Sequence, residues 1–482
     1  MILIKAKETK DVLNKWDSKT FVNFENGAYN VYRSDACRYK DVFLKVFFEE
    51  LNDANVRYCV LRNYERLPIS TGGSDIDMWV HESDIENCIA VLNRASESAK
   101  MRLVTFFSDC TAIKVGIQNN KGGVQIDIFK GAVYYKQKVL VSGELIAAST
   151  KAYNGIQVLS KEFGDLLALV KEFMNNSKVK EKYLIPIYAK KDFYSIGYLR
   201  KILPNFNEPF LQLLCECIKE ISVTENIYQL KNLGQKSLSN KNKHTSFALK
   251  MAKVKRLLGK RPGYVIVVEG TDGSGKSFII NSITPILNGA FHNGVVYNHL
   301  RPNWLPDIAV VLGKRKKPKD GQDVKVVSDP HAGKQSGFAM SLVRWGWYML
   351  DYTLGFMKKV WLPIHSKSKV FIFDRYYYEF YLDQKRSHVK LPNWVVRVGE
   401  LFLPKPDLIL CLGGDPEKIY ARKPETSLEE VQRQTAVLKD FCSKRKNAVW
   451  IDTTVKPEES IEATMLAITA MMSKRFKIDD VR

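Results

Sequence analysis

The feature that most constrains the fold of this chain is a glycine-rich segment near its middle, Gly270-Thr-Asp-Gly-Ser-Gly-Lys-Ser277. It matches the phosphate-loop pattern G-x4-G-K-[S/T] in full. The apolar run YVIVVE precedes it and the helix-like run FIINSITPIL follows it, which is the context that this motif requires. Glycines let successive backbone N–H groups point into one concavity, and a helix N-terminus adds partial positive charge. The segment predicts a nucleoside triphosphate site at a strand-to-helix turn.

The residues of this loop have separate expected roles. Lys276 is expected to reach the β- and γ-phosphates, and the Ser277 hydroxyl is expected to ligate Mg²⁺. The backbone and side chains around the phosphates form the cofactor-binding set: Gly270, Asp272, Gly273, Ser274, Gly275, Lys276 and Ser277.

A second apolar run, KVFIF, ends in Asp374-Arg375. A carboxylate at the end of a strand beside the phosphate loop can hold Mg²⁺ or its water, and the adjacent arginine can neutralise charge on the transferred phosphoryl group. Further on, Arg422 and Lys423 follow another strand and turn, in a polar stretch. They are expected to form a basic lid that excludes water from the phosphates.

Strand-like and helix-like segments alternate from residue 262 to 482. The strand candidates are YVIVVEG, VFIFD, DLILCLG and AVWIDT. This alternation predicts an α/β fold with a parallel sheet and helices on both faces.

The phosphate loop, the segment VFIFDRYYYE and the segment PDLILCLGGDPEKIYAR together resemble the thymidylate kinase family of P-loop nucleoside monophosphate kinases, over residues 262–482. The resemblance implies ATP and Mg²⁺ as cofactors. It also implies that Asp374-Arg375 is the family's DR pair, that Arg422 is the lid arginine, and that Asp272 touches the sugar of the acceptor. Arg301 and Arg344 correspond to arginines on the acceptor side. The catalytic residues implied are Lys276, Asp374, Arg375 and Arg422.

One departure from that family concerns the acceptor. Members usually carry a phenylalanine four residues before the helix arginine, where it stacks on thymine, and this chain has Met340 there. The segment between Arg301 and Arg344 is also long. The acceptor is therefore expected to be a phosphorylated or hydroxyl compound other than thymidylate: another nucleotide, a sugar phosphate or a glycan end. Because thymidylate kinases are commonly dimers, the resemblance also suggests a homodimer.

The most informative feature of the N-terminal part is a set of three aspartates. Strand-like and helical runs mix in this part, as they do in an α+β domain. Asp75 and Asp77 alternate along a strand candidate, so their side chains share a face, and Asp127 lies on a later strand candidate. Three converging carboxylates can hold Mg²⁺ ions for an in-line displacement at a nucleotide phosphate. GSDIDMWV and VQIDIF resemble the polymerase-β-like nucleotidyltransferase superfamily, over about 40–150. Many members of that superfamily carry a Gly-Ser turn well upstream of the acids, where it grips the triphosphate. In this chain Gly73-Ser74 directly precedes Asp75, and Arg62 is the candidate for a phosphate contact instead.

Composition shifts divide the chain into four parts. We expect a nucleotidyltransferase-like domain at 1–150, a helical appendage at 151–230, a basic linker and helix at 231–261, and the P-loop domain at 262–482. The net charge is +22, and 231–262 carries ten Lys and Arg residues without Asp or Glu. Such a segment can bind an anionic membrane surface or nucleic acid, or can simply be a solvated helix face. Without an RNA-binding or zinc-finger signature, nucleic acid is the less favoured partner.

The expected function is thus that of an ATP-dependent kinase fused to a metal-dependent nucleotidyltransferase-like domain. By analogy with fusions of this kind, its expected pathway is surface-polysaccharide metabolism. The alternatives are a nucleic-acid-binding or modifying enzyme and a nucleotide-binding scaffold at a membrane. No run of about 18 apolar residues is present, so no membrane span is expected. The expected location is cytoplasmic, either free or peripheral at the inner membrane face.

Overall fold

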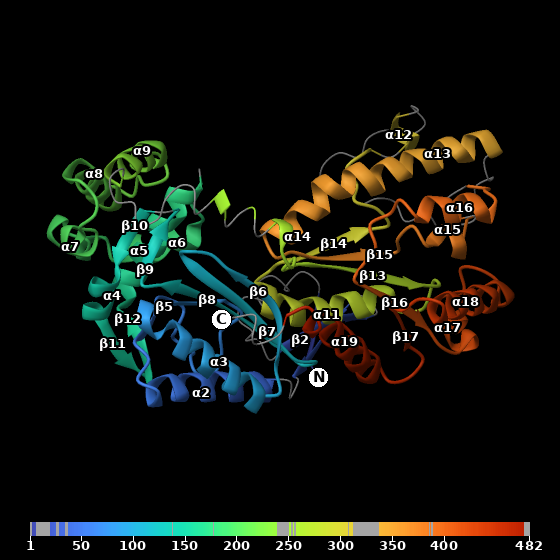
Figure 1. Ribbon diagram of the computed structural model, residues 1–482, viewed down its shortest axis with the longest axis horizontal. Coiled ribbons are helices and arrows are strands. Elements are labelled where there is room, and N and C mark those ends of the chain that lie inside the picture. The colour runs from blue at the N-terminus through green and yellow to red at the C-terminus, as the bar shows by residue number, and fades with distance from the viewer. Residues whose placement is uncertain are drawn as a thin grey trace.

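The computed structural model of the 482-residue chain describes residues 2–5, 20–25, 28–33, 37–136, 138–176, 178–238, 250–251, 254, 257–306, 308–311, 337–384, 386 and 389–476. Two regions built on sheets lie side by side, with a group of helices beside the first (Figure 1). Among the described helices, none combines the length and apolar character that crossing a bilayer would need. Within the segment 231–261, the residues FALKMAKVKRLL at 247–258 have the spacing of a basic amphipathic helix, and most of them lie outside the described residues. A second basic run, GKRKKPKDGQDVK at 313–325, has the composition of an exposed loop and also lies outside the described residues.

The first region contains a mixed sheet of seven strands, in the order β11-β12-β4-β5-β8-β7-β6. β5 runs parallel to β8 and antiparallel to β4. Because β12 pairs with β4, the sheet continues to Leu159, past the boundary expected at 150. Its elements are α2 (Cys37–Asp53), β4 (Tyr58–Val60), β5 (Ile76–Val80), α3 (Ile85–Ser98), β6 (Arg102–Ser108), β7 (Ala112–Gln118), β8 (Gly123–Lys130), β11 (Thr150–Tyr153) and β12 (Ile156–Leu159).

Alternate residues of this sheet face two different cores. In β5, Ile76 and Met78 belong to the core that includes α2 and α3, whereas Trp79 belongs to the core of the helical group. Asp77 therefore faces the side of the helical group, as alternation along a strand requires. Asp127 takes the same side, because its neighbours Ile126 and Ile128 pack in the first core.

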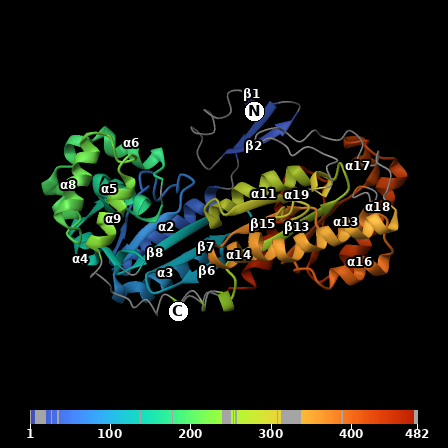
Figure 2. The ribbon, with the colours of Figure 1, turned by 90° about the horizontal axis from the view of Figure 1, so that it is seen from above.

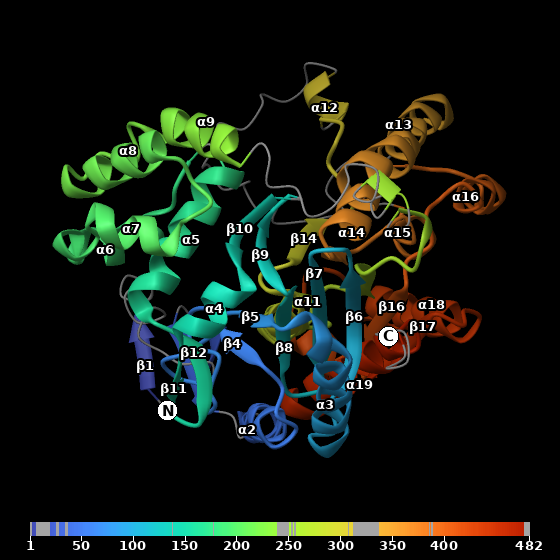
Figure 3. The ribbon, with the colours of Figure 1, turned by 60° about the vertical axis from the view of Figure 1, so that its left-hand side comes forward.

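The helical group covers that side of the sheet (Figure 3). The segment DLLALVKEFM has apolar residues at three- and four-residue spacings, as one face of a helix requires, and it lies within α5. The group comprises α5 (Lys161–Asn175), α6 (Glu181–Ala189), α7 (Ile196–Ile202), α8 (Glu208–Lys219) and α9 (Ile227–Ser237). α9 extends into the segment expected to be a linker. Smaller elements are β9 (Ala132–Tyr135), β10 (Lys138–Ser142), α4 (Gly143–Ser149), and a sheet of β1 (Ile2–Lys5), β2 (Thr20–Glu25) and β3 (Ala28–Arg33), which lies beside α11 (Figure 2).

The second region contains a five-stranded sheet in the order β14-β15-β13-β16-β17, with every pairing parallel. The four strand candidates of this region are confirmed. The strands are β13 (Tyr264–Gly270), β14 (Val295–His299), β15 (Val370–Asp374), β16 (Leu408–Gly413) and β17 (Ala448–Asp452). Such parallel strands, buried on both faces, need helices on both sides.

Helices cover both faces of this sheet, as the sequence predicted. Along β13, Ile266 and Val268 face the core that holds α11 and α19, while Val265 and Val267 face the core of α13 to α18. The helices are α11 (Lys276–Phe291), α12 (Ile308–Val311), α13 (Phe338–Leu350), α14 (Leu362–Ser366), α15 (Glu379–Leu382), α16 (Asn393–Glu400), α17 (Pro416–Arg422), α18 (Leu428–Ser443) and α19 (Pro457–Ser473). Two short π-helical segments, Asp351–Gly355 and Met357–Trp361, join α13 to α14.

The two sheet regions share one continuous core, formed where α11 and α19 pack against the first sheet. Hydrogen bonds between described residues cross this junction, among them one from the Asn120 side-chain amide to Glu462 Oε1 at 2.7 Å. The Tyr264 hydroxyl donates to the Val104 carbonyl oxygen at 2.5 Å, the Thr105 hydroxyl donates to the Pro262 carbonyl oxygen at 2.8 Å, and Gln118 donates to the Thr469 hydroxyl at 3.0 Å.

Candidate functional site

The phosphate loop forms the predicted strand–turn–helix, since β13 ends at Gly270 and α11 begins at Lys276. Gly273 and Gly275 have φ angles of 81° and 82°, a left-handed conformation that costs little only for glycine. A Cβ atom on Gly273 would also lie 2.7 Å from the carbonyl oxygen of Ile419, in the last turn of α17. The end of α17 therefore lies directly against the loop.

Lys276 is buried at the start of α11 and folds back over the loop. Its Nζ donates to the carbonyl oxygens of Gly270 and Thr271, each at 2.8 Å. Burial, and after it the nearby charge of Arg375, lowers the pKa of Lys276 to about 8. Phosphate oxygens are stronger acceptors than neutral carbonyl oxygens, so a bound polyphosphate can compete for this ammonium group.

Several buried oxygens beside the loop have no hydrogen-bond partner among the described residues. They are the Ser274 hydroxyl, the Thr271 hydroxyl and Oδ1 of Asp374. Buried polar atoms are nearly always hydrogen-bonded in folded proteins. These three oxygens therefore indicate that ligand or solvent atoms bind here.

Asp374 ends β15, next to the end of β14. Its Oδ2 accepts a hydrogen bond from the Tyr297 hydroxyl at 3.1 Å, and His299 Nδ1 lies 3.8 Å from the same oxygen. Burial alone would raise the pKa of Asp374, but the nearby imidazole of His299 and the charge of Lys276 outweigh it and lower the pKa. An ionised carboxylate at this position can bind Mg²⁺ or one of its waters.

Arg375 is held between two carboxylates. Its Nη1 donates to Glu379 Oε1 at 2.6 Å, and its Nη2 donates to Asp272 Oδ1 at 2.7 Å. Arg386 also forms an ion pair with Asp272. Burial works against ionisation of Asp272, yet Arg375, Lys276 and Arg386 lower its pKa to about 2.

Sequence reasoning missed Glu379 and Arg386. The spacing of four residues between Arg375 and Glu379 was the available signal for the first. Nothing local marks Arg386. Glu269, directly before the loop, was also missed: its Oε1 accepts the backbone N–H of Tyr376 at 2.8 Å, and burial beside Glu379 raises its pKa well above the usual value.

The arginines predicted on the acceptor side have different environments. Arg301 is 8% exposed and pairs with fully buried Asp351, with 3.0 Å between Nη1 and Oδ2. Arg344 on α13 is half-buried, and its Nε has no hydrogen-bond partner among the described residues. Arg422 is exposed at the end of α17, the helix that contacts Gly273. The structure thus brings together Asp272, Lys276, Asp374 and Arg375, while Arg301 is committed to a buried ion pair.

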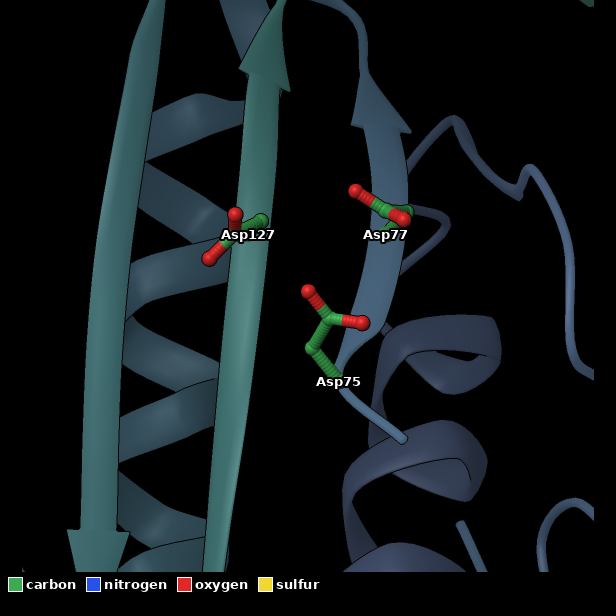
Figure 4. A group of neighbouring side chains, drawn as sticks. All are labelled: Asp75, Asp77 and Asp127. Carbon is green, nitrogen blue, oxygen red and sulfur yellow. The ribbon is translucent and has the colours of Figure 1, made fainter. Parts of the chain in front are cut away.

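The N-terminal carboxylates converge as the alternating pattern predicted. Asp77 on β5 lies opposite Asp127 on β8 in the parallel register, and Asp75 directly precedes β5 (Figure 4). One carboxylate oxygen from each of the three lies within 4.8 Å of the others. A set of carboxylate oxygens is the donor set that Mg²⁺ and Mn²⁺ prefer, so the residues fit a divalent cation.

Basic side chains surround these carboxylates. Arg62 pairs with Asp77, and Lys114 pairs with Asp127 from the neighbouring strand. Burial acts to raise the pKa of Asp77, but the charges of Lys171 and Arg62 outweigh it and lower the pKa. Of these cations, only Arg62 was a candidate from the sequence.

A small pocket of about 160 Å³ adjoins Asp77 on the side of the helical group. Arg62, Lys171 and Tyr183 are among the residues that line it. The Lys171 ammonium lies 4.1 Å from the centre of the Phe129 ring. The pocket thus places positive charge next to the carboxylates. This arrangement suits an anionic ligand that the cations contact directly and that the carboxylates bind through a metal ion.

No family model matches the chain. Over 157 residues the chain is 30% identical to a probable thymidylate kinase of Pyrococcus horikoshii, and the match covers 31% of this chain and 64% of that protein, so the chain spans less than two thirds of the relative's length. Thymidylate kinase structures from Candida albicans and Ehrlichia chaffeensis align with 42% and 40% of this chain and with 89% and 88% of their own. Their identities are 18% and 19%, and their TM-scores are 0.30 and 0.25. Part of this chain is therefore similar in sequence to a thymidylate kinase.

Proposed function

We propose that this chain is an ATP-dependent phosphotransferase that acts on a nucleotide. The observation that carries the proposal is the convergence of Lys276, Asp272, Asp374 and Arg375 at the turn between β13 and α11. The sequence similarity to a probable thymidylate kinase supports a nucleotide as the acceptor. A sugar phosphate or a glycan end is the alternative acceptor, because Met340 stands where thymidylate kinases usually carry a phenylalanine.

The side chains around the loop suit phosphoryl transfer. The loop N–H groups and Lys276 bind the β- and γ-phosphates, and Arg375 stabilises the negative charge that develops on the transferred group. Ser277 and Asp374 would hold Mg²⁺, which would supply positive charge against the negative charge of the phosphates. An acceptor oxygen attacks the γ-phosphorus, the bond from that phosphorus to the β–γ bridging oxygen breaks, and ADP leaves.

The remaining predicted residues have roles around this centre. Arg422, on the helix that contacts Gly273, forms part of a lid that excludes water from the phosphates. Arg344, whose Nε lacks a described partner, binds the acceptor phosphate. Arg301, fixed by Asp351, lies on the same acceptor side.

A second activity is proposed for the N-terminal region, namely metal-dependent nucleotidyl transfer. Asp75, Asp77 and Asp127 would hold Mg²⁺, which would align a nucleotide α-phosphate for attack. The cationic pocket beside Asp77 supports this proposal, because a nucleoside triphosphate needs positive charge for its other phosphates. The domain boundaries expected from the sequence are proposed with two changes: the first domain ends at Leu159, and the helical appendage ends with α9 at Ser237.

A homodimer is proposed from the exposed apolar side chains of α13 and the segment that follows it. These side chains are Phe338, Leu342, Val343, Leu350, Leu354 and Met357. Several exposed apolar side chains along one segment mark an interaction site more often than isolated apolar residues do. We place the protein in the cytoplasm, where ATP is available, with the basic segment 231–261 as the part that would contact an anionic membrane. A role in surface-polysaccharide metabolism would follow if the acceptor is a sugar.

An ADP-release assay with magnesium tests the kinase proposal over a panel of nucleoside monophosphates and sugar phosphates. ADP release that depends on one acceptor is expected for the wild type, with kcat lowered at least about 100-fold in Lys276→Ala and in Asp374→Asn. Lys439→Ala, an exposed residue on α18, is the matched control. Full turnover by Lys276→Ala, or ADP release without any acceptor dependence, would contradict the proposal.

A further inference from the structure

We propose that the carboxylate site of the first sheet is a composite site, completed by His292 from the other sheet region, and that His292 is a positioning residue for Asp75. The inference deepens the metal site proposed above and rests on it.

One helix connects the two candidate sites. α11 begins at Lys276 in the phosphate loop and ends at Phe291. Its 16 residues make it about 24 Å long. His292 follows in a left-handed conformation, with φ of 37°, and its Nδ1 lies 3.7 Å from Oδ1 of Asp75. The same helix therefore contributes to phosphate binding at one end and reaches the carboxylates at the other.

The end of α11 is fixed against the first sheet by contacts between backbones. A Cβ atom on Gly116 of β7 would lie 2.4 Å from the carbonyl oxygen of Ala290, and one on Gly123 of β8 would lie 2.7 Å from the backbone nitrogen of Ala290. By strand alternation, Gly116 shares a face with Lys114, and Gly123 shares a face with Asp127. α11 thus ends on the face that carries the carboxylates, and only glycine permits this approach.

Asp75 differs from the other two carboxylates in its partners. Asp77 and Asp127 each have a short ion pair, to Arg62 and Lys114. The nearest basic groups to Asp75 are farther away: Arg62 Nη2 lies 3.9 Å from its Oδ1, and His292 Nδ1 lies 3.7 Å from the same oxygen. Of the two, the imidazole is slightly nearer, and it is the basic group that the second sheet region contributes.

The imidazole is suited to orient a metal-binding carboxylate. A small rotation of either side chain brings Nδ1 to hydrogen-bond distance from one oxygen of Asp75, which leaves the other oxygen for a cation. Outer-shell hydrogen bonds of this kind orient metal ligands, and their loss typically costs 10- to 100-fold in metal affinity. Cationic side chains in the adjacent pocket then suit the phosphates of the bound ligand.

Mn²⁺ binding to the nucleotide-free full-length protein tests the inference, with free Mn²⁺ measured by electron paramagnetic resonance. The background is Asp374→Asn, so that the phosphate-loop region contributes no second site. His292→Gly removes the imidazole and tolerates the left-handed backbone. His292→Asn also tolerates it and places an amide near the position of Nδ1. Asn293→Gly, at the exposed neighbour with φ of 55°, is the matched control.

We expect His292→Gly to weaken Mn²⁺ binding about 10- to 100-fold, His292→Asn to restore most of the affinity, and Asn293→Gly to bind like the wild type. Melting temperatures should stay unchanged, which separates positioning from a structural role. If Asp77→Asn loses Mn²⁺ while His292→Gly keeps it, the metal site stands and the composite site is wrong. If Asp77→Asn binds as the wild type does, or the wild type does not bind, the metal site itself is wrong and this inference falls with it.

Discussion

Arg375 and Glu379 form a buried ion pair in which the arginine backbone is left-handed, with φ of 69° and 2.6 Å between Nη1 and Oε1. Only 5% of Arg375 and 1% of Glu379 are exposed. A non-glycine residue in this conformation costs free energy and persists only when its surroundings hold it. Here the pair directs the second guanidinium nitrogen to Asp272, so Glu379 positions Arg375 beside the phosphate loop.

Glu379→Gln is expected to lower the free energy of unfolding by about 3 kcal/mol, because it removes one charge of a buried pair and leaves Arg375 with less compensation. Urea denaturation measures the change. Asp440→Asn is the matched control, since Asp440 and Lys444 have the same four-residue spacing but are 60% and 67% exposed. That control should change stability by less than about 0.5 kcal/mol. Equal changes in the free energy of unfolding of the two variants would show that burial of the Arg375–Glu379 pair does not contribute to stability.

The strands of the parallel sheet could be predicted from the sequence, because buried parallel strands are continuous apolar runs and one of them carries the phosphate loop. That Asp75 and Asp77 lie on the same face could also be predicted, because the alternation of side chains along a strand depends only on local sequence. Other partners could not be found in this way. His292 and Asp75 meet only because α11 packs on the first sheet, and Arg386 reaches Asp272 across distant segments. Such contacts depend on tertiary packing, for which no local pattern exists.

Nucleotide affinity is expected to fall as the pH rises through about 8, because Lys276 has a pKa of about 8 and is neutral above it. A neutral amine cannot attract the β- and γ-phosphates, and affinity can decline by at most about tenfold per pH unit for one proton. Titration of a fluorescent, non-hydrolysable ATP analogue between pH 6.5 and 9.5 measures this dependence. Lys276→Ala should bind weakly with little change over the same range. A wild-type affinity that stays constant to pH 9.5 would contradict the assignment.

The stability of the wild type is expected to decline in acid through Asp272. Its pKa in the folded protein, about 2, lies below its ordinary value of 3.8, so its stabilisation is almost complete above about pH 5 and is lost as the pH falls towards 2. The full contribution is about 2 kcal/mol, of which about 1 kcal/mol is lost at pH 3. Urea denaturation at pH 6 and pH 3 should therefore show the difference between wild type and Asp272→Asn shrinking by that amount. A difference that is constant with pH would mean that Asp272 titrates normally.

Gly123→Ala is expected to disturb the junction between the two sheet regions. The new Cβ would lie 2.7 Å from the backbone nitrogen of Ala290 and 2.9 Å from its Cβ, so α11 would have to shift. Overpacking of this kind typically costs about 1–3 kcal/mol, which thermal unfolding would detect. Gly122→Ala is the matched control, because a Cβ at Gly122 meets no atom within 4 Å. Since the same shift would move His292 away from Asp75, Gly123→Ala should also weaken Mn²⁺ binding, while Gly122→Ala should leave both stability and binding unchanged. Equal behaviour of the two variants would contradict the close packing of α11 on β8.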